Sequence, residues 1–308
     1  MGLYSKRRSS MNKPKVLIVG AGKVGSVLAR ALYSQGYELV GIVSRTFDSA
    51  QELAKQFGVK AGTEAADFTK EANIVLLTTP DRYIGKVVEE LVKESGFMPG
   101  HVVIHTSGCL PTEILKPARE QGAFIGCMHP LQSFANKELS IEALSGVYFA
   151  LSGQDEMIAA GRKIVEDLGG NGFVMLDKDR ALYHAGACIV SNYTVSLMHW
   201  ASQLYSSFGL SREEASKALL PLLQGTVNQI KELGPTEALT GPISRGDSIT
   251  IEAHLQVLEN DEEKNLYQNL GLYTLGVALE KGTIDQMQAN CMTELLKMKL
   301  KEKEDEQQ

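Results

Sequence analysis

Polar side chains that could transfer a proton lie on one stretch in the second half of the chain. His184, Cys188 and Asn192 are spaced i, i+4 and i+8, which puts them on one face of a helix. Histidine is the side chain best suited to exchange a proton near neutral pH. The spacing predicts His184 as a proton donor and Asn192 as the group that orients a reacting oxygen. A hydrogen-bonded core histidine is the alternative for His184.

A second polar segment, TGPISRGD at residues 240–247, precedes Thr250 and His254. Its glycine and proline end one helix, Asp247 can cap the next, and Thr250 and His254 then share one face of that helix. Arg245 is a candidate clamp for an acidic substrate, because a guanidinium binds a carboxylate through paired hydrogen bonds. A salt bridge from Arg245 to Asp247 that braces the turn is the alternative. His254 and His129 are candidates for a secondary polar wall.

A glycine-rich hexapeptide, GAGKVG at residues 20–25, follows the apolar run KVLIVG and opens a helical stretch. In this G-x-G-x-x-G pattern Gly20 permits a tight turn, Gly22 lets a pyrophosphate approach the backbone, and Gly25 lets the helix pack on the strand. Lys23 and Val24 belong to the same turn, where free N–H groups at a helix start favour an anion. The pattern predicts a dinucleotide site rather than a structural glycine turn.

The end of the second apolar run distinguishes between NAD and NADP. An NAD site usually has Asp or Glu about 20 residues beyond the glycines, to bind the ribose 2′-hydroxyl. This chain has Ser44, Arg45 and Thr46 at that place. A hydroxyl and a guanidinium suit a 2′-phosphate, so the sequence predicts NADP(H). A solvated surface residue is the alternative for Arg45.

Three further apolar runs also end in polar residues. In a doubly wound sheet the ligand lies beyond the carboxyl ends of the strands. Thr78, Thr79 and Pro80 are therefore expected near the ribose and diphosphate, and the pair Thr106 and Ser107 near the nicotinamide. His129 follows the next run and could face the nicotinamide or the substrate. The alternatives are that Thr79 and Ser107 cap helices and that His129 packs under Pro130.

Composition narrows the class of protein. The chain has 308 residues, of which 44% are hydrophobic and 22% charged, so collagen-like, coiled-coil and disordered classes have no support. A net charge of -6 predicts no nucleic-acid or membrane partner. No apolar run approaches the roughly 20 residues of a membrane span. Four scattered cysteines, without a C-x-x-C pair, predict reduced thiols, no metal site and a cytoplasmic protein.

The elements that must position these residues change character along the chain. Up to Asp177, short apolar runs alternate with amphipathic stretches, which is typical of a parallel sheet with helices on both faces. After Asp177, long stretches with a 3.6-residue period predict helices. We expect an α/β fold: a doubly wound Rossmann domain over residues 13–178 and an all-helical C-terminal domain over 179–300. Residues 1–12 and 301–308 are expected to be flexible tails.

Several motifs together support a resemblance. GAGKVG, SRT, TTPD, HTSG, CMHPLQSF and TGPISRGDSIT resemble those of Rossmann-like proteins whose C-terminal half is a helical domain of unknown function. That family is similar in architecture to 6-phosphogluconate dehydrogenase-like reductases, which include ketopantoate reductase, pyrroline-5-carboxylate reductase and the coenzyme F420-dependent NADP reductases. The resemblance, from Lys13 to about Leu300, implies an NADP-linked oxidoreductase that dimerises through its helical half.

Two positions depart from the ketopantoate reductase pattern. That branch carries a catalytic lysine followed by asparagines four and eight residues later, whereas this chain has His184, Cys188 and Asn192. Either His184 takes over with different chemistry or the substrate differs. The leading hypothesis is an NADPH-dependent reductase of a small carbonyl or imine compound, such as the 2-oxo acid ketopantoate. A non-catalytic NADP(H)-binding regulator is the alternative from another class.

Overall fold

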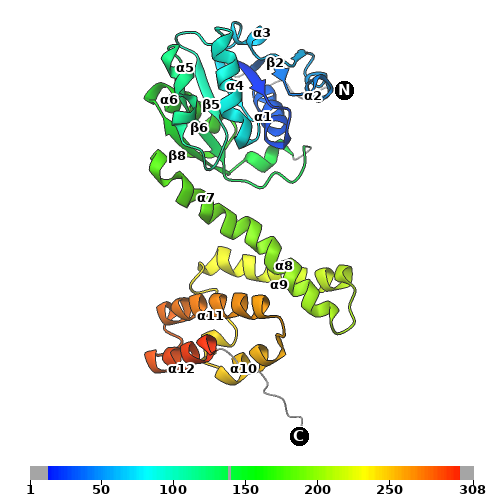
Figure 1. Cartoon of the computed structure of the whole chain (residues 1–308), viewed down its shortest axis with the longest axis vertical. Coiled ribbons are helices and arrows are strands. Elements are labelled where there is room, and N and C mark those ends of the chain that lie inside the picture. Colours follow the sequence, from blue (N-terminus) through cyan, green and yellow to red (C-terminus); the bar gives the residue numbers. More distant parts are fainter. Residues whose placement is uncertain (1–12, 138–139, 299–308) are drawn as a thin grey trace. The chain divides into compact units, whose positions relative to one another are not determined.

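The computed structural model describes residues 13–137 and 140–298, and it divides into two compact units that meet at Val195 and Ser196 (Figure 1). The predicted flexible tails at residues 1–12 and 301–308 lie outside the described residues. The first unit is an α/β Rossmann fold and the second is helical, which confirms the predicted fold class. The first unit extends beyond the predicted boundary at residue 178 and includes the helix that follows.

An eight-stranded sheet forms the centre of the first unit. Its strand order is β3-β2-β1-β4-β5-β6-β7-β8, and all neighbouring pairs are parallel except β6 with β7. The order reverses between β1 and β4, which leaves a crevice beyond their carboxyl ends. The strands are β1 (Lys15–Val19), β2 (Glu38–Val43), β3 (Lys60–Gly62), β4 (Ile74–Leu77), β5 (Val102–His105), β6 (Phe124–Pro130), β7 (Tyr148–Gly153) and β8 (Asn171–Val174).

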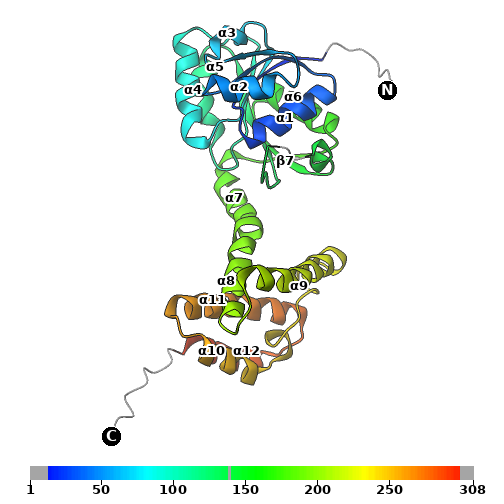
Figure 2. The same ribbon diagram turned by 90° about the vertical axis from the view of Figure 1, so that its right-hand side faces the viewer.

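Helices cover both faces of this sheet, because the strands are apolar on both sides. One core joins alternate strand residues, such as Ile18 and Leu76, to α1, α2 and α6. The other joins the residues between them, such as Leu17 and Val75, to α3, α4 and α5. Figure 2 shows α1 and α6 on one side and α4 and α5 on the other. These helices are α1 (Lys23–Ser34), α2 (Phe47–Ala54), α3 (Ala66–Thr69), α4 (Asp81–Lys93), α5 (Lys116–Glu120) and α6 (Asp155–Asp167).

The chain then enters a helical segment that is not uniformly α-helical. It consists of α7 (Arg180–Cys188), a π-helical turn (Ile189–Tyr193) and α8 (Thr194–Ser206). A π turn holds one more residue than an α turn and changes the side-chain register. The i, i+4, i+8 prediction assumed an unbroken α-helix, whereas a π-helical turn lies between Cys188 and Asn192.

The second unit packs around its own apolar core. Side chains of α10, α11 and α12, among them Ile251, Leu275 and Met292, form this core. In contrast, α9 leaves Leu220, Leu222 and other large apolar side chains exposed. Within the described residues no helix has the length and apolar composition of a membrane span. The helices of this unit are the remainder of α8, α9 (Arg212–Leu233), α10 (Ser248–Val257), α11 (Asp261–Lys281) and α12 (Gln286–Lys297).

Candidate functional site

The glycine turn joins β1 to α1 at the reversal point of the sheet. Gly20 has a φ of 123°, a backbone conformation that strongly favours glycine. A Cβ on Gly20 would lie 2.7 Å from the Thr78 carbonyl carbon, and one on Gly25 would overlap the Gly20 carbonyl oxygen. A Cβ on Gly22 would meet nothing within 4 Å. The first and third glycines thus allow close packing, whereas Gly22 faces open space that a ligand could occupy.

Thr78 braces this turn from the end of β4. Its buried hydroxyl donates to the carbonyl oxygens of Gly20, at 2.8 Å, and Val19, at 3.2 Å. The hydroxyl of Thr79 is buried and has no hydrogen-bond partner within the described part of the chain. Thr79 is therefore the better placed of the two to donate to a bound ligand, because its hydroxyl is not already used by the turn.

We expect Thr78→Val to destabilise the protein by about 1–2 kcal/mol. Valine keeps the shape of threonine but leaves the Gly20 carbonyl without its buried donor. Chemical denaturation followed by circular dichroism would measure the loss. Thr106→Val is the matched control, since the Thr106 hydroxyl makes only a long contact of 3.5 Å to the Leu77 carbonyl. Equal losses in the two variants would contradict the bracing role of Thr78.

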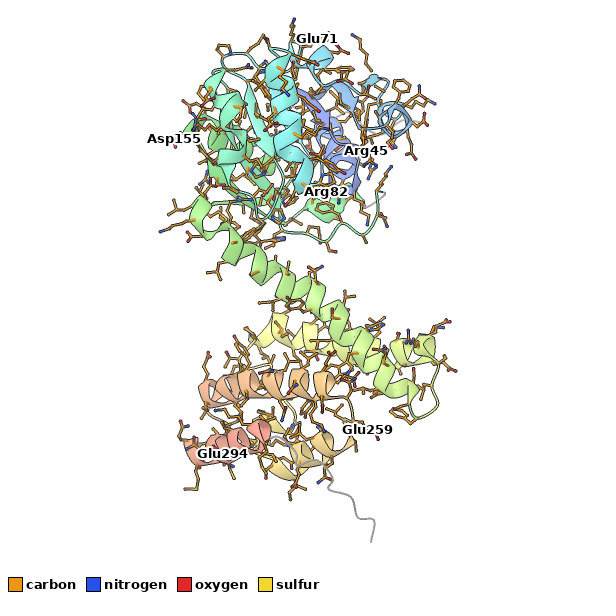
Figure 3. The ribbon with its side chains drawn as sticks, viewed as in Figure 1. Arg45, Glu71, Arg82, Asp155, Glu259 and Glu294 are labelled. Atoms are coloured by element: carbon orange, nitrogen blue, oxygen red, sulfur yellow. The ribbon has the colours of Figure 1, made fainter. Side chains whose placement is uncertain are left out.

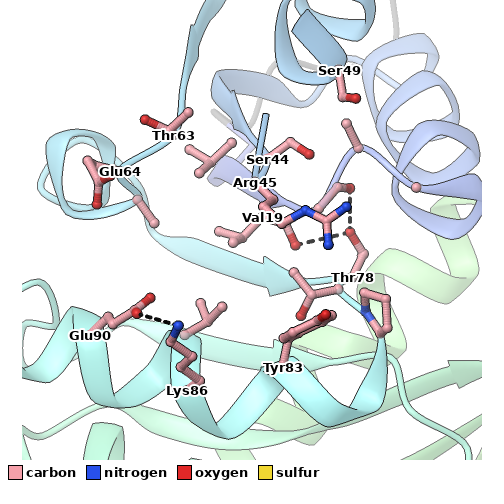
Figure 4. A pocket seen from close by; sticks show the side chains of 18 of the residues that line it. Val19, Ser44, Arg45, Ser49, Thr63, Glu64, Thr78, Tyr83, Lys86 and Glu90 are labelled. Carbon is pink, nitrogen blue, oxygen red and sulfur yellow. Dashed lines mark hydrogen bonds and ion pairs between the residues drawn. The ribbon is translucent and has the colours of Figure 1, made fainter. Parts of the chain in front are cut away.

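A pocket of about 630 Å³ opens beyond these strand ends (Figure 4). Its walls come from the glycine turn, from the ends of β2, β3 and β4, and from α4. Figure 4 shows the Arg45 side chain extending into it from the end of β2, with Tyr83 and Lys86 approaching from α4. Of the predicted cofactor residues, the pocket is lined by Gly20, Gly22, Ser44, Arg45, Thr46, Thr78, Thr79 and Pro80.

Four cationic side chains line this pocket, and two of them stand out. Lys86 approaches Glu90 at 3.6 Å, and Lys137 approaches Glu52 at 3.2 Å. Arg45 and Arg82 form no ion pair with any residue that the structure describes. Both are labelled in Figure 3. Two guanidinium groups without carboxylate partners make the pocket suitable for phosphate.

The remaining predicted cofactor residues lie outside the pocket lining. Lys23 is exposed at the start of α1, and Val24 packs against the core. Thr106 is half-buried at the end of β5. The Ser107 hydroxyl donates to Asp81 Oδ2 at 2.7 Å and accepts from the Leu110 N–H at 3.0 Å. Ser107 thus braces the loop after β5, whereas the alternative weighed for it from the sequence was a helix cap; the helix that follows has Pro111 at its N-cap.

A buried arginine joins the start of α7 to the sheet. Arg180 is 1% exposed, and it donates to Ser152 Oγ at 2.9 Å, to Cys127 Sγ at 2.7 Å and to the Ser107 carbonyl oxygen. It forms no ion pair with a described carboxylate, and its Nε has no hydrogen-bond partner there. These bonds reach the ends of β5, β6 and β7. They explain why the first unit includes α7.

Two of the predicted site histidines lie together beside this arginine. The rings of His129 and His184 are perpendicular, with centroids 6.0 Å apart. His129 Nδ1 is hydrogen-bonded to the Tyr183 hydroxyl at 2.7 Å. Burial, together with the nearby His184 and Arg180, lowers the pKa of His129 to about 4. His129 is therefore neutral at pH 7.

The predicted partners of His184 are only partly brought to it. Cys188 Sγ lies 3.7 Å from His184 Nε2. Asn192 lies in the π-helical turn, on an exposed part of the helix. His184 Nδ1 is buried, with no hydrogen-bond partner among the described residues. The side chains that meet at His184 are thus His129 and Cys188.

The second polar segment belongs to the helical unit. Asp247 caps α10 by accepting from the Thr250 N–H at 3.1 Å, and Arg245 Nη2 lies 3.9 Å from Asp247 Oδ2. The Arg245 side chain remains 65% exposed. His254 Nδ1 is hydrogen-bonded to the Tyr267 hydroxyl at 2.7 Å. Within this unit, both Arg245 and His254 therefore have a local structural partner.

Sequence reasoning missed several residues of the site. Tyr183 and Arg180 were overlooked because apolar periodicity drew attention to the neighbouring His184. Arg82 and Lys86 follow Asp81 at the start of α4, and their spacing i, i+4 on a helix could have revealed a cationic face. Lys137 lies far along the chain, and no local pattern connects it with the pocket. The described residues hold no cluster of His, Cys, Asp or Glu that could bind a metal ion.

Comparison with known families accounts for both halves of the chain. Residues 5–130 match the Rossmann-like domain, and residues 147–274 match a domain of unknown function, DUF2520. The chain thus carries a Rossmann-like domain followed by a DUF2520 domain. The DUF2520 match starts within the sheet, before β7, and continues through α9 into α11. The resemblance inferred from the motifs is confirmed.

Several solved structures are similar to this chain over most of its length. A Bacteroides fragilis protein assigned as an NADP oxidoreductase is 25% identical, with a TM-score of 0.72 over 87% of this chain and 100% of its own. A Thermotoga maritima protein is 28% identical, with a TM-score of 0.69 over 86% of this chain and 99% of its own. A Streptococcus pyogenes pyrroline-5-carboxylate reductase, at 15% identity and a TM-score of 0.56, shares the fold over 91% of this chain and 98% of its own.

Among curated proteins, the DUF2520 protein is similar to glutamyl-tRNA reductases. The enzyme from Shewanella amazonensis is 25% identical over 253 residues, which is 79% of this chain but 56% of the relative. The chain thus spans little more than half the length of that relative.

Proposed function

We propose that this protein is an NADPH-dependent oxidoreductase that reduces a small carbonyl or imine compound. The observation that carries the proposal is the pocket at the reversal point of the sheet, where an open glycine turn and Arg45 lie together. The similar Bacteroides fragilis protein, assigned as an NADP oxidoreductase, supports the same activity.

The residues present fit a phosphorylated dinucleotide. The space beside Gly22 leaves room for a pyrophosphate, and the unpartnered Thr79 hydroxyl could donate to it. Ser44 and Arg45 would hold the 2′-phosphate, since a guanidinium pairs with phosphate oxygens through charge-assisted hydrogen bonds. Arg82 adds a second unpaired charge to the same pocket. A bound nicotinamide dinucleotide would supply the hydride for the reduction.

The substrate would lie near the loop after β5. This loop is connected to the cofactor pocket through Asp81, which holds Ser107 and stands between the pocket residues Pro80 and Arg82. His184 is the proposed proton donor, with His129 beside it. We also propose that Asn192 orients the reacting oxygen and that Arg245 and His254 contact the substrate. A 2-oxo acid such as ketopantoate is the most specific substrate that we propose.

Ligand-induced stabilisation tests the cofactor. A ligand that binds only the folded state at 100 times its Kd stabilises that state by about 2.7 kcal/mol. We expect NADP(H) to raise the Tm at concentrations where NAD(H) has little effect. NADPH oxidation with 2-oxo acids and cyclic imines would then test the reduction, with His184→Ala expected to stop turnover and preserve NADPH binding. Tight NADPH binding without turnover would favour a non-catalytic regulator instead.

We also propose that the protein forms a homodimer through its helical half and acts in the cytoplasm. Exposed apolar side chains of α9, such as Leu222 and Val227, support the first part. The four cysteines are free thiols, which supports the cytoplasmic location, because disulfides are rare in that compartment. Light scattering on the full chain would measure the oligomeric state, and a monomer would contradict the dimer.

A further inference from the structure

Gly108 separates the two histidines of the site. A Cβ placed on this residue would lie 2.6 Å from His184 Nδ1 and 2.9 Å from His129 Nε2. These two ring nitrogens therefore approach the same point from different elements, one from α7 and one from β6. The φ angle of Gly108 is not in the left-handed region, so its backbone does not require glycine. What the position requires is the absence of a side chain between the imidazoles.

The hydrogen bonds of the two imidazole rings indicate the order in which a proton could pass along them. The Tyr183 hydroxyl is hydrogen-bonded to His129 Nδ1, and His129 Nε2 is directed toward Gly108 and His184. His184 Nδ1 is buried without a partner, and its Nε2 is directed toward Cys188. A buried acceptor without a donor is unfavourable, so a donor that moves within reach is favoured. His129 Nε2 is the group in position to become that donor.

We propose that Tyr183, His129 and His184 form a proton relay that crosses the site over Gly108 and ends at His184 Nε2. The relay rests on the proposed reduction and gives its proton a path. Burial raises the pKa of Tyr183 to about 12 and lowers that of His129 to about 4, so a hydroxyl proton and one imidazole proton are both retained at pH 7. The charged or titratable groups around His129 include His184, Tyr183, Arg180 and His105.

The relay balances the reaction. The hydride from NADPH forms the new C–H bond, the electron pair of the C=O or C=N bond moves to oxygen or nitrogen, and NADP⁺ is left. His184 Nε2 gives its proton to that atom and regains one at Nδ1 from His129 Nε2. His129 regains one at Nδ1 from the Tyr183 hydroxyl, and half-buried Tyr183 takes one from water. Both imidazoles then carry their proton on Nδ1, and exchange with water returns each to the Nε2 form before the next turnover. Tyr183 and His129 thus act through His184, and only His184 touches the substrate.

Nitrogen NMR of protein labelled with ¹⁵N-histidine tests the relay without a substrate. We expect both His129 and His184 to carry their proton on Nε2 at pH 7. Tyr183→Phe keeps the ring packing but removes the hydroxyl, so the His129 proton should redistribute between Nδ1 and Nε2. Tyr193→Phe changes an exposed tyrosine at the end of the π-helical turn; it is the matched control and should leave both signals unchanged. A wild-type His129 protonated on Nδ1, or unchanged signals in Tyr183→Phe, would overturn the relay.

Gly108→Ala tests the crossing point. The added methyl would hold the imidazoles apart, and we expect turnover of a 2-oxo acid or cyclic imine to fall about 100-fold, within the range typical of a lost proton donor. A solvent deuterium isotope effect should increase in the same variant, and NADPH binding should persist. Gly186→Ala, on α7 with open space around its Cβ, is the control. Wild-type turnover and isotope effect in Gly108→Ala would overturn the relay. If the wild-type protein did not bind NADPH, that result would contradict the proposed function. The NMR test of the relay would still be valid.

Discussion

Arg45→Ala should weaken NADPH binding by about 10- to 100-fold and change NADH binding by less than about 3-fold. A hydrogen bond to a charged group contributes about 1.5–3 kcal/mol, and a 1.4 kcal/mol loss is a tenfold change in affinity. NADH lacks the 2′-phosphate that Arg45 is proposed to bind, so its affinity should change little. Fluorescence titration of each nucleotide into the wild type and the variant would measure both constants.

Arg119→Ala is the matched control for Arg45. Arg119 lies on α5 of the same unit, does not line the pocket and is paired with Glu113 at 2.9 Å. Its removal should leave both constants unchanged. Arg45 would lose its proposed role if Arg45→Ala weakened NADPH and NADH equally. Arg82→Ala would then identify whether the second unpaired guanidinium holds the phosphate.

The stability of the protein should fall as the pH decreases from about 6.5 to 4. The pKa of His129 is lowered to about 4, so the unfolded chain binds its proton first and acid favours unfolding. The contribution of neutral His129 to the free energy of unfolding is complete above pH 6.5 and is lost as the pH falls through 4. A shift from 6.5 to about 4 corresponds to about 3 kcal/mol. His105, whose pKa is lowered to about 3 mainly by burial, acts in the same direction.

His129→Asn isolates this contribution. Asparagine can keep a hydrogen bond to Tyr183 but cannot take up the proton. Urea denaturation at a series of pH values should show a smaller decrease in the free energy of unfolding for the variant than for the wild type. The two curves should converge near pH 4. Parallel curves would mean that His129 already titrates normally in the folded protein.

Most of the sheet could be predicted because its strands are continuous apolar runs. The apolar runs described from the sequence all form strands, since burial on both faces leaves no polar alternation. The short strand β3, with the sequence KAG, has no such run and was missed. The reversed direction of β7 was also missed, because strand pairing depends on contacts with β6 that no local pattern encodes.

The cofactor site was more predictable than the substrate site. A glycine turn must stand at the end of β1, so local sequence places Gly20 and Gly22. His184 was selected by helical spacing, but its contact with His129 depends on the packing of α7 against β6. Gly108 could not be recognised, because its importance lies in two ring nitrogens that converge only in the folded chain. The spacing also gave no sign of the π-helical turn that holds Asn192.

The buried guanidinium of Arg180 gives this end of the sheet a permanent positive charge. It is sealed from water and forms no ion pair with a carboxylate among the described residues, so dissolved salt screens its field less than that of a surface arginine. An anion that enters near the loop after β5 would experience this attraction at any pH, since arginine does not deprotonate in proteins. Selection of an acidic substrate over its neutral amide should therefore persist at high ionic strength.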